Sequence, residues 1–471
     1  MFTSKKKLLA LSLGLCLTAS TLALASCNKG GYQSSSEPQT SESTPIEAIK
    51  STNGLIYTLS PDGSYYSVTG YDGTSKKVIC GDYYKDLPIK EIADNAFRGT
   101  AIEKIELSSG ITKIGQYAFF ACKTLSSVTI PDTVTEIGDY AFSACSSLTN
   151  VDLPEGVTHI YDKAFYRSIN LISITLPESL THVGCGVFEG CDNLQYYYYD
   201  NAKYLGNSEN KFVALIKADR ENRSCAVHQG AKVIAGEAFE DCTSLNSVTV
   251  SKNVITIGDR AFKDCSSLKL ITLPENLETI GVSAFAYCNQ LTSVNLPNNL
   301  KVIGDGAFSH SGITKIYIPD LVEVIPAYTF NECKNLDEAE MGKGVKVIDD
   351  YAFNNCVSLK NVLVKNLENG TLEKIGSFAF ANTKALESLT IPASVKEVGE
   401  KAFIDSNLQR IYSYHTKDAF SQNGLNISLA GLPIYFYSEV EPSLNQQGTA
   451  YDGNYFFVDE NQDKQIWVYN P

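Results

Sequence analysis

Apolar residues return along this chain in a fixed order, and one copy of that order runs from Leu125 to Leu148. Val128 and Ile130 flank a polar residue, which is the period-2 pattern of a short strand with one buried face. Pro131 then ends strand pairing, because proline has no amide hydrogen to donate. The copy therefore begins with a strand of a few residues.

The second half of the copy predicts a change of direction. Val134 and Ile137 are the next inward-facing residues, and Gly138 permits a turn that a Cβ atom would obstruct. Ala141 and Phe142 then open a short helical or 3₁₀ piece. A small residue before the phenylalanine allows consecutive copies to approach closely.

Phe142 belongs to a series of thirteen marker phenylalanines. They are Phe97, Phe119, Phe142, Phe165, Phe188, Phe239, Phe262, Phe285, Phe308, Phe330, Phe353, Phe380 and Phe403. Most neighbours are 23 residues apart, and one gap of 51 equals an ordinary unit plus an irregular unit of 28. A fixed period in this range predicts a solenoid in which each unit is one coil stacked on the last.

We therefore predict an α/β, β-rich solenoid of about 14 coils, with short strands on one face and short helical or 3₁₀ turns on the other. The solenoid occupies residues 93–410 and contains an irregular, tyrosine-rich coil at 195–231, whose exposed rings either pack on neighbours or contact a ligand. Open solenoid ends require covers. We expect an N-terminal cap at 51–92, built on a hairpin, and a β-rich C-terminal cap at 411–471.

The repeated pattern L-x-x-V-x-L-P-x-x-V-x-x-I-G-x-x-A-F-x-x-C resembles the BspA-type, or treponemal-type, leucine-rich repeat family of surface lipoproteins. Residues 291–297, 303–304 and 307–308 show it well, and the match covers roughly residues 55–412. The resemblance implies a right-handed curved solenoid and, more weakly, a bacterial surface protein that adheres to host proteins or other cells. Unlike commoner leucine-rich repeats, no asparagine ladder follows the strand, where Thr133, Gly156 and Ser179 stand.

The first 26 residues read as a lipoprotein signal peptide. Three lysines at 5–7 precede an apolar segment at 8–24, and small residues lead to Cys27. This junction looks like a bacterial lipobox, which implies diacylglycerol on Cys27 and cleavage before it; an ordinary signal or an uncleaved anchor helix is the alternative. Residues 27–50 are rich in Ser and Pro without apolar periodicity, so we expect a disordered tether.

The charge balance bears on partners. The 39 basic residues fall to 36 once the three signal lysines are removed, and against 53 acidic residues they leave a net charge of about −17. This excess of negative charge argues against nucleic acid, or an anionic membrane surface, as the partner.

Thirteen cysteines in an exported chain would ordinarily indicate disulfides. Eight of them, however, stand three residues after a marker phenylalanine, where other units carry Ser or Thr. These eight are Cys122, Cys145, Cys191, Cys242, Cys265, Cys288, Cys333 and Cys356. A position that accepts Cys, Ser or Thr favours a buried ladder of thiols, although a bond between the remaining Cys185 and Cys225 stays open.

Chemistry-bearing motifs are few. His159 and His182 share a column with Glu136, which could form a surface zinc site, but an exposed turn position that tolerates polar residues is the preferred interpretation. We find no H-E-x-x-H, Walker loop or nucleophile elbow, and no nucleophile beside a base. We therefore expect a non-enzyme with neither a metal nor a cofactor.

The strand face offers the best candidate for ligand contact, because solenoids bind through such extended faces. Its outward columns consist mainly of Ser and Thr, which strand propensity and solubility also explain. Larger residues interrupt the columns near their C-terminal end. The candidate contacts are Ser293, Asn295, Lys315, Tyr317, Glu340 and Tyr412.

Three functions remain open. The first is a lipid-anchored, adhesin-like module on the bacterial surface that binds an extracellular protein or glycan. The second is a structural scaffold of the cell envelope without a dedicated external ligand. The third is an enzyme whose site lies at 195–231 or 411–471.

Overall fold

The computed structural model of the chain describes residues 49–51, 53–365, 367, 370–422, 425 and 431–470. The expected signal peptide at 1–26, the expected lipidation site Cys27 and the tether as far as residue 48 lie outside these residues. Within the described part, no helix combines the length and apolar character that crossing a membrane requires.

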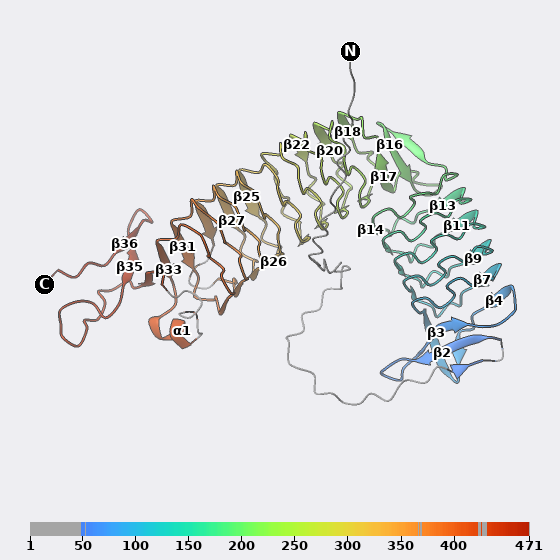
Figure 1. Cartoon of the computed structure of the whole chain (residues 1–471), viewed down its shortest axis with the longest axis horizontal. Helices are drawn as coiled ribbons and strands as arrows, with labels where there is room; N and C mark the ends of the chain where they lie inside the picture. The colour runs from blue at the N-terminus through green and yellow to red at the C-terminus, as the bar shows by residue number, and fades with distance from the viewer. Residues whose placement is uncertain are drawn as a thin grey trace, which may run out of the picture. The chain divides into compact units, whose positions relative to one another are not determined.

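Short parallel strands form two rows that follow the stacking direction (Figure 1). The first row contains β4 (Lys77–Ile79), β7 (Lys104–Glu106), β9 (Ser127–Thr129), β11 (Asn150–Asp152), β13 (Ser173–Thr175), β18 (Ser224–Ala226), β20 (Ser247–Thr249), β22 (Leu270–Thr272), β25 (Lys315–Ile318), β27 (Glu338–Met341), β29 (Asn361–Val364), β31 (Ser388–Ile391) and β33 (Arg410–Ser413). Equivalent residues of successive coils pair, as Val151 does with Ile174.

The second row begins one corner later in each coil. It contains β6 (Leu87–Ile92), β8 (Lys113–Ile114), β10 (Glu136–Ile137), β12 (His159–Ile160), β14 (His182–Val183), β19 (Val233–Ile234), β21 (Thr256–Ile257), β23 (Thr279–Ile280), β24 (Val302–Ile303), β26 (Val324–Ile325), β28 (Val347–Ile348), β30 (Lys374–Ile375) and β32 (Glu397–Val398). The predicted solenoid is confirmed, with about 17 turns instead of about 14, because strands at both ends continue the stacking.

The two ends of the solenoid have different structures. At the N-terminal end, β1 (Ile49–Lys50), β2 (Leu55–Leu59) and β3 (Tyr66–Tyr71) are antiparallel neighbours, and β3 joins β6 in the second row, while β5 (Tyr83–Tyr84) flanks β6. At the C-terminal end, β33 continues into β34 (Ile434–Tyr437), β35 (Tyr455–Val458) and β36 (Lys464–Ile466). The helix α1 (Lys417–Gln422) precedes β34.

The third face of each coil, which carries the marker phenylalanine, is built from turns and not from the helical pieces that the sequence predicts. Tyr140 and Ala144 adopt positive φ values of 54° and 58°, and the same two positions are left-handed in the other regular coils. Left-handed residues cannot continue a right-handed helix. Alternate amides consequently bond in different directions: Ala141 and Ser143 donate within the coil, whereas Tyr140, Phe142 and Ala144 donate to the next one.

The marker phenylalanines stack beneath this turn face. Consecutive rings lie 4.7–5.8 Å apart between centroids, with interplanar angles of 3–15°. Most of the rings, including Phe142, are fully buried. Each ring therefore contributes both burial and contact with its neighbours in the stack.

Glycine recurs at the position of Gly138 in other coils, and the structure gives a different reason for it from the one that the sequence suggests. A Cβ atom at Gly138 would lie 2.7 Å from the carbonyl carbon of Gly115, in the preceding coil. Gly258, Gly281 and Gly304 meet the preceding backbone in the same way. Glycine is thus needed for close approach between coils, and not for a special φ value at this corner.

Cysteine thiols form hydrogen bonds between successive coils. In seven coils the thiol donates to the backbone carbonyl of the marker phenylalanine in the preceding coil at 2.9–3.2 Å, as Cys145 does to Phe119. The donors are Cys122, Cys145, Cys191, Cys265, Cys288, Cys333 and Cys356. Ser168 makes the same bond to Phe142 at 2.8 Å, which explains why serine can replace cysteine. Of the described cysteines all eleven are free, and the thiols of Cys185 and Cys225 lie 3.6 Å from the carbonyls of Asp259 and Asp200.

The expectation that no asparagine follows the strand is wrong for three consecutive coils in the middle of the solenoid. Asn253, Asn276 and Asn299 occupy the position of Thr133 and Ser179. Each donates its side-chain amide to a carbonyl of the preceding coil at 2.7–2.9 Å. Thr133 and Ser179 donate to the preceding coil through their hydroxyl groups, whereas Gly156 has no side-chain donor, so the position accepts several residues without requiring a donor.

The irregular coil divides the core. Residues 195–231 contain a meander of β15 (Tyr197–Tyr199), β16 (Ala202–Leu205) and β17 (Ala214–Ala218), followed by β18 of the first row; within the meander only β17 joins the second row. Buried apolar residues form two clusters, which meet at this coil, since Tyr204 belongs to one and Leu205 to the other. Within the described part, no ring contact joins Phe188 to Phe239, so the phenylalanine stack is interrupted here.

Replacing Phe142 by alanine should lower the free energy of unfolding by about 3–5 kcal/mol, because a fully buried ring leaves a cavity between its two stacking neighbours. Cys145→Ser should change it by less than about 1 kcal/mol, because serine keeps the donor. Urea unfolding of the two variants measures the difference. Equal, small losses would contradict a core position for Phe142.

Native thiols should resist alkylation. Burial raises the pKa of Cys191 to about 12 and that of Cys242 to about 11, so both are protonated at pH 8 and shielded from solvent. Iodoacetamide at pH 8, followed by mass spectrometry, should leave the described cysteines unmodified until denaturant is added, after which all eleven should react. A cysteine that reacts only after reduction would reveal a disulfide.

Candidate functional site

The first strand row changes character before its C-terminal end, where β25, β27 and β29 replace small polar residues with large ones. Parallel pairing places Lys315 beside Glu338, and Tyr317 beside Glu340. The next coil adds Leu363 beside Glu340. One coil earlier, Ser293 and Asn295 occupy the same two columns and are exposed. We call these residues, together with Lys365, the strand-face patch.

Electrostatic contacts connect the patch across three coils. The Lys365 ammonium lies 2.9 Å from the Glu340 carboxylate and 4.7 Å from the centre of the Tyr317 ring. Lys315 reaches the Glu338 carboxylate at 3.5 Å. The aromatic ring thus carries a cation on its face, an arrangement that stabilises a positive charge near an exposed surface.

The Asp320 carboxylate holds the Tyr317 hydroxyl in place. The Tyr317 hydroxyl donates to Asp320 at 3.3 Å, and the same carboxylate oxygen accepts the Lys343 amide at 2.8 Å. The Lys343 amide and the Tyr317 hydroxyl lower the pKa of Asp320, while hydrogen bonding to Glu340 raises the pKa of Lys365. Both groups are therefore charged at neutral pH.

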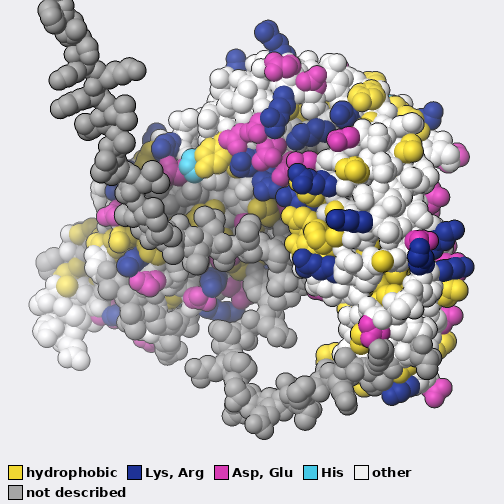
Figure 2. All heavy atoms as spheres, turned by 45° about the vertical axis from the view of Figure 1, so that its right-hand side comes forward, with side chains coloured by type: hydrophobic (Ala, Val, Ile, Leu, Met, Phe, Trp, Pro, Cys, Tyr) yellow, Lys and Arg dark blue, Asp and Glu magenta, His cyan; other side chains and the backbone are white. Residues whose placement is uncertain are grey.

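Charge is otherwise mixed over the surface. Figure 2 shows basic and acidic side chains interspersed with small apolar patches on the face that it presents. Several ion pairs join equivalent positions of successive coils, for example Lys301 with Glu278 at 2.9 Å and Lys346 with Glu323 at 2.8 Å. Such exposed pairs contribute little stability and create no large field of one sign.

Five of the six candidate contacts lie together, and the sixth does not. Ser293, Asn295, Lys315, Tyr317 and Glu340 belong to the strand-face patch. Tyr412, in contrast, is only 8% exposed, because Tyr435 and Phe456 of the C-terminal strands pack against its ring at 5.9 and 4.9 Å. It is a packing residue and not an outward contact in this structure.

Sequence reasoning did not identify Lys365, which follows the strand and therefore lies outside the two columns. The sequence did indicate its position. Glu340 and Leu363 stand 23 residues apart in one column, and Lys365, two residues after Leu363, would point to the same face if the extended backbone continued. The position of its ammonium over Tyr317 depends on side-chain packing across two coils, which spacing does not specify.

The column of Glu136, His159 and His182 is present as expected, because the three residues pair in register on β10, β12 and β14. The two imidazole rings stack at 5.7 Å, and burial lowers the pKa of both. Among the described residues, no group of three or more His, Cys, Asp or Glu side chains is arranged to hold a metal ion.

The repeat region matches a known family. The family model described as the BspA type leucine rich repeat region matches in six copies, over residues 90–211, 220–337 and 323–427. A comparison with curated proteins found no match.

Several solved structures are similar to this chain. A leucine-rich repeat protein from Bacteroides ovatus is 22% identical, with 82% of this chain and 99% of that chain covered and a TM-score of 0.33. A leucine rich cell surface protein from Faecalibacterium prausnitzii is 24% identical, with 69% and 96% covered and a TM-score of 0.29. The pneumococcal vaccine antigen PcpA is 18% identical, with 80% and 96% covered and a TM-score of 0.31.

Proposed function

We propose that this chain, which belongs to the BspA-type leucine-rich repeat family, is an interaction module that binds an extracellular protein or glycan through the strand-face patch. The observation that carries the proposal is the cluster around Tyr317, where an aromatic ring, a cation and two carboxylates interrupt a ladder of small polar residues. Tyrosine is among the side chains that contribute most to binding energy at protein interfaces, and Tyr317 lies at the centre of this cluster.

The geometry of the patch supports a binding role over a purely structural one. Its ion pairs are partly exposed, so they contribute little to the stability of the fold. Fold stability alone therefore does not explain why these charged residues are gathered here. The parallel strands beneath it hold the backbone rigid, so the side chains are presented without a large cost in conformational entropy. The proposal assigns the protein no catalytic role and no cofactor.

The proposed location is the outer surface of a bacterial cell membrane, reached by export and held by lipid on Cys27. The support comes from the charged, apolar and small-residue segments that precede Cys27 in the sequence. The Ser- and Pro-rich residues that follow would act as a spacer between the membrane and the solenoid.

Binding through the patch is tested with residues 51–471 on a glycan array and on immobilised extracellular-matrix proteins. The double change Tyr317→Ala and Lys365→Ala should weaken binding to any captured ligand at least about tenfold, because it removes the ring and its cation together. Surface plasmon resonance measures the change in affinity.

The matched control is the double change Thr129→Ala and Thr249→Ala, which removes two exposed side chains from the first strand row outside the patch. It should bind as the unmodified protein does. If both double variants lose affinity equally, or if neither does, the patch is not the binding site.

Replacing Cys27 by alanine should release the protein from membranes, because the thiol that would carry the lipid is lost. Fractionation of expressing cells, followed by immunodetection, compares the variant with the unmodified chain. Continued membrane retention would instead identify the apolar segment at 8–24 as the anchor.

A further inference from the structure

The interruption of the phenylalanine stack opens a pocket in the solenoid. The coils of Phe188 and Phe239 meet at one corner as ordinary neighbours do, since the Gly236 amide donates to the Val183 carbonyl at 2.9 Å. A Cβ atom at Gly236 would lie 2.8 Å from the Cys185 backbone nitrogen. Beyond this corner the coils separate, and a pocket of about 640 Å³ lies between them.

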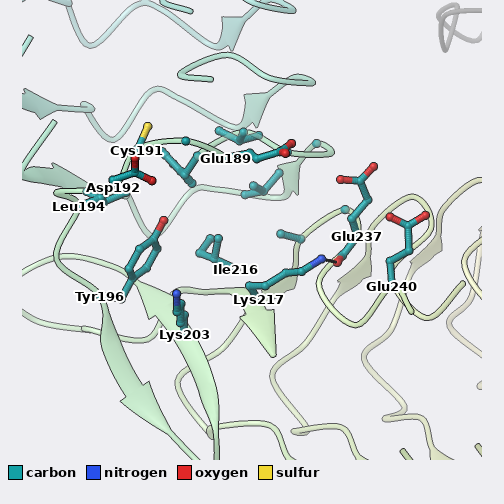
Figure 3. Close-up of a pocket in the computed structure, with 18 of the residues that line it drawn as sticks. Glu189, Cys191, Asp192, Leu194, Tyr196, Lys203, Ile216, Lys217, Glu237 and Glu240 are labelled. Carbon is teal, nitrogen blue, oxygen red and sulfur yellow. Dashed lines mark hydrogen bonds between the residues drawn. The ribbon is translucent and has the colours of Figure 1, made fainter. Parts of the chain in front are cut away.

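The pocket is bounded by three segments, which Figure 3 shows together. Glu189, Cys191, Asp192 and Leu194 come from the coil of Phe188, and Glu237 and Glu240 come from the coil of Phe239. The β15–β17 meander supplies the third wall, with Tyr196, Lys203, Ile216 and Lys217. A volume of this size is typical of sites that enclose a ligand.

Three backbone amides on one wall lack their usual acceptors. In the preceding coil, Lys163, Phe165 and Arg167 donate to carbonyls of the coil of Phe188. The equivalent donors of the coil of Phe188 are Gly186, Phe188 and Gly190; all three line the pocket, and within the described residues their amides make no hydrogen bond. Buried amides are nearly always paired, and Phe188 is buried while Gly186 and Gly190 are half-buried. These three alternate amides are therefore open to an acceptor that enters the pocket.

The opposite wall is satisfied only in part, since the carbonyls of Gly236 and Glu240, which would also accept from an ordinary neighbouring coil, accept no hydrogen bond among the described residues. The Ala238 carbonyl, which would accept from an ordinary neighbouring coil, accepts the Ala218 amide at 2.8 Å. The Glu237 carbonyl accepts the Lys217 ammonium. The wall formed by the coil of Phe188 therefore presents unpaired donors, and an occupant has to bring acceptors spaced two residues apart, as alternate carbonyls of a polypeptide are.

Charge in the pocket argues against an anionic occupant. Lys203, Lys217 and Arg220 are balanced by Glu189, Asp192, Glu237 and Glu240, and Arg220 is paired with Asp241 at 3.3 Å. Burial raises the pKa of Glu237, and the neighbouring Glu240 carboxylate adds to this effect. The Arg260 guanidinium acts in the opposite direction, but the net pKa is still raised. A site with this balance suits neutral carbonyl groups better than phosphate or sulfate.

We infer that this pocket binds a polypeptide segment of a partner protein, whose alternate main-chain carbonyls accept hydrogen bonds from the amides of Gly186, Phe188 and Gly190. Glycine at both left-handed positions, with φ values of 57° and 74°, leaves these amides without a side chain beside them. The site is separate from the strand-face patch, and the inference does not depend on it.

The probe is a nine-residue peptide with the sequence of residues 137–145, carrying the change Cys145→Ser. Within the protein this segment offers the carbonyls of Asp139, Ala141 and Ser143 to the amides of the coil of Phe119, so it has the required acceptors. The full chain is labelled with ¹⁵N-glycine, and the Gly186 and Gly190 amides are followed by NMR and by hydrogen exchange.

Without peptide, the hydrogens of these two amides should exchange with solvent faster than those of hydrogen-bonded amides at the same positions of other coils. The peptide should shift both resonances and slow their exchange by on the order of tenfold. The change Glu240→Trp, which fills the pocket wall, should weaken peptide binding at least about tenfold. Asn331→Trp, at the same half-buried position of an uninterrupted coil, is the control and should have no effect.

Protection of both amides in the free protein would overturn the inference, because it would show that they already have partners. Unchanged resonances at about 1 mM peptide would overturn it as well. So would binding that Glu240→Trp and Asn331→Trp affect equally, since the peptide would then bind elsewhere. Circular dichroism confirms that both variants keep the strand content of the unmodified chain.

Discussion

The alternation of hydrogen-bond direction along the turn face is the constraint on which this structure depends. Tyr140, Phe142 and Ala144 donate to the next coil while the amides between them donate within their own. This arrangement requires two left-handed residues in each coil, at a cost of about 1–2 kcal/mol for each non-glycine residue. The bonds to the next coil and the burial of a phenylalanine ring offset that cost, so the turn is stable only when a neighbour is stacked on it.

Several other features follow from the same close stacking. Glycine at the corner lets the backbones of two coils approach, and the cysteine thiol reaches the preceding phenylalanine carbonyl because the coils are so near. Cysteine, serine and threonine interchange because the position requires a small donor and not a covalent bond. The same rigidity holds Tyr317 and Lys365 of the strand-face patch in contact across one intervening strand, β27.

Much of this architecture is encoded in spacing and could be predicted from the sequence. The period of Phe142 and its equivalents indicates both the solenoid and the buried seam, because identical residues at a fixed interval must occupy equivalent places. The turn conformation was not predictable, since Tyr140 and Ala144 are not residues that signal a left-handed backbone. Five candidate contacts follow from column alternation, whereas the burial of Tyr412 and the position of Lys365 depend on packing between distant segments.

The irregular coil has a consequence for how the protein comes apart. In a linear array, each coil is stabilised by its own contacts and by the interfaces with its two neighbours. The coils of Phe188 and Phe239 share a corner but no ring contact, so the interface between them is weaker than those on either side. We therefore expect the described solenoid to unfold as two cooperative blocks in series, so that melting that starts in one block can stop at this boundary while the other remains folded.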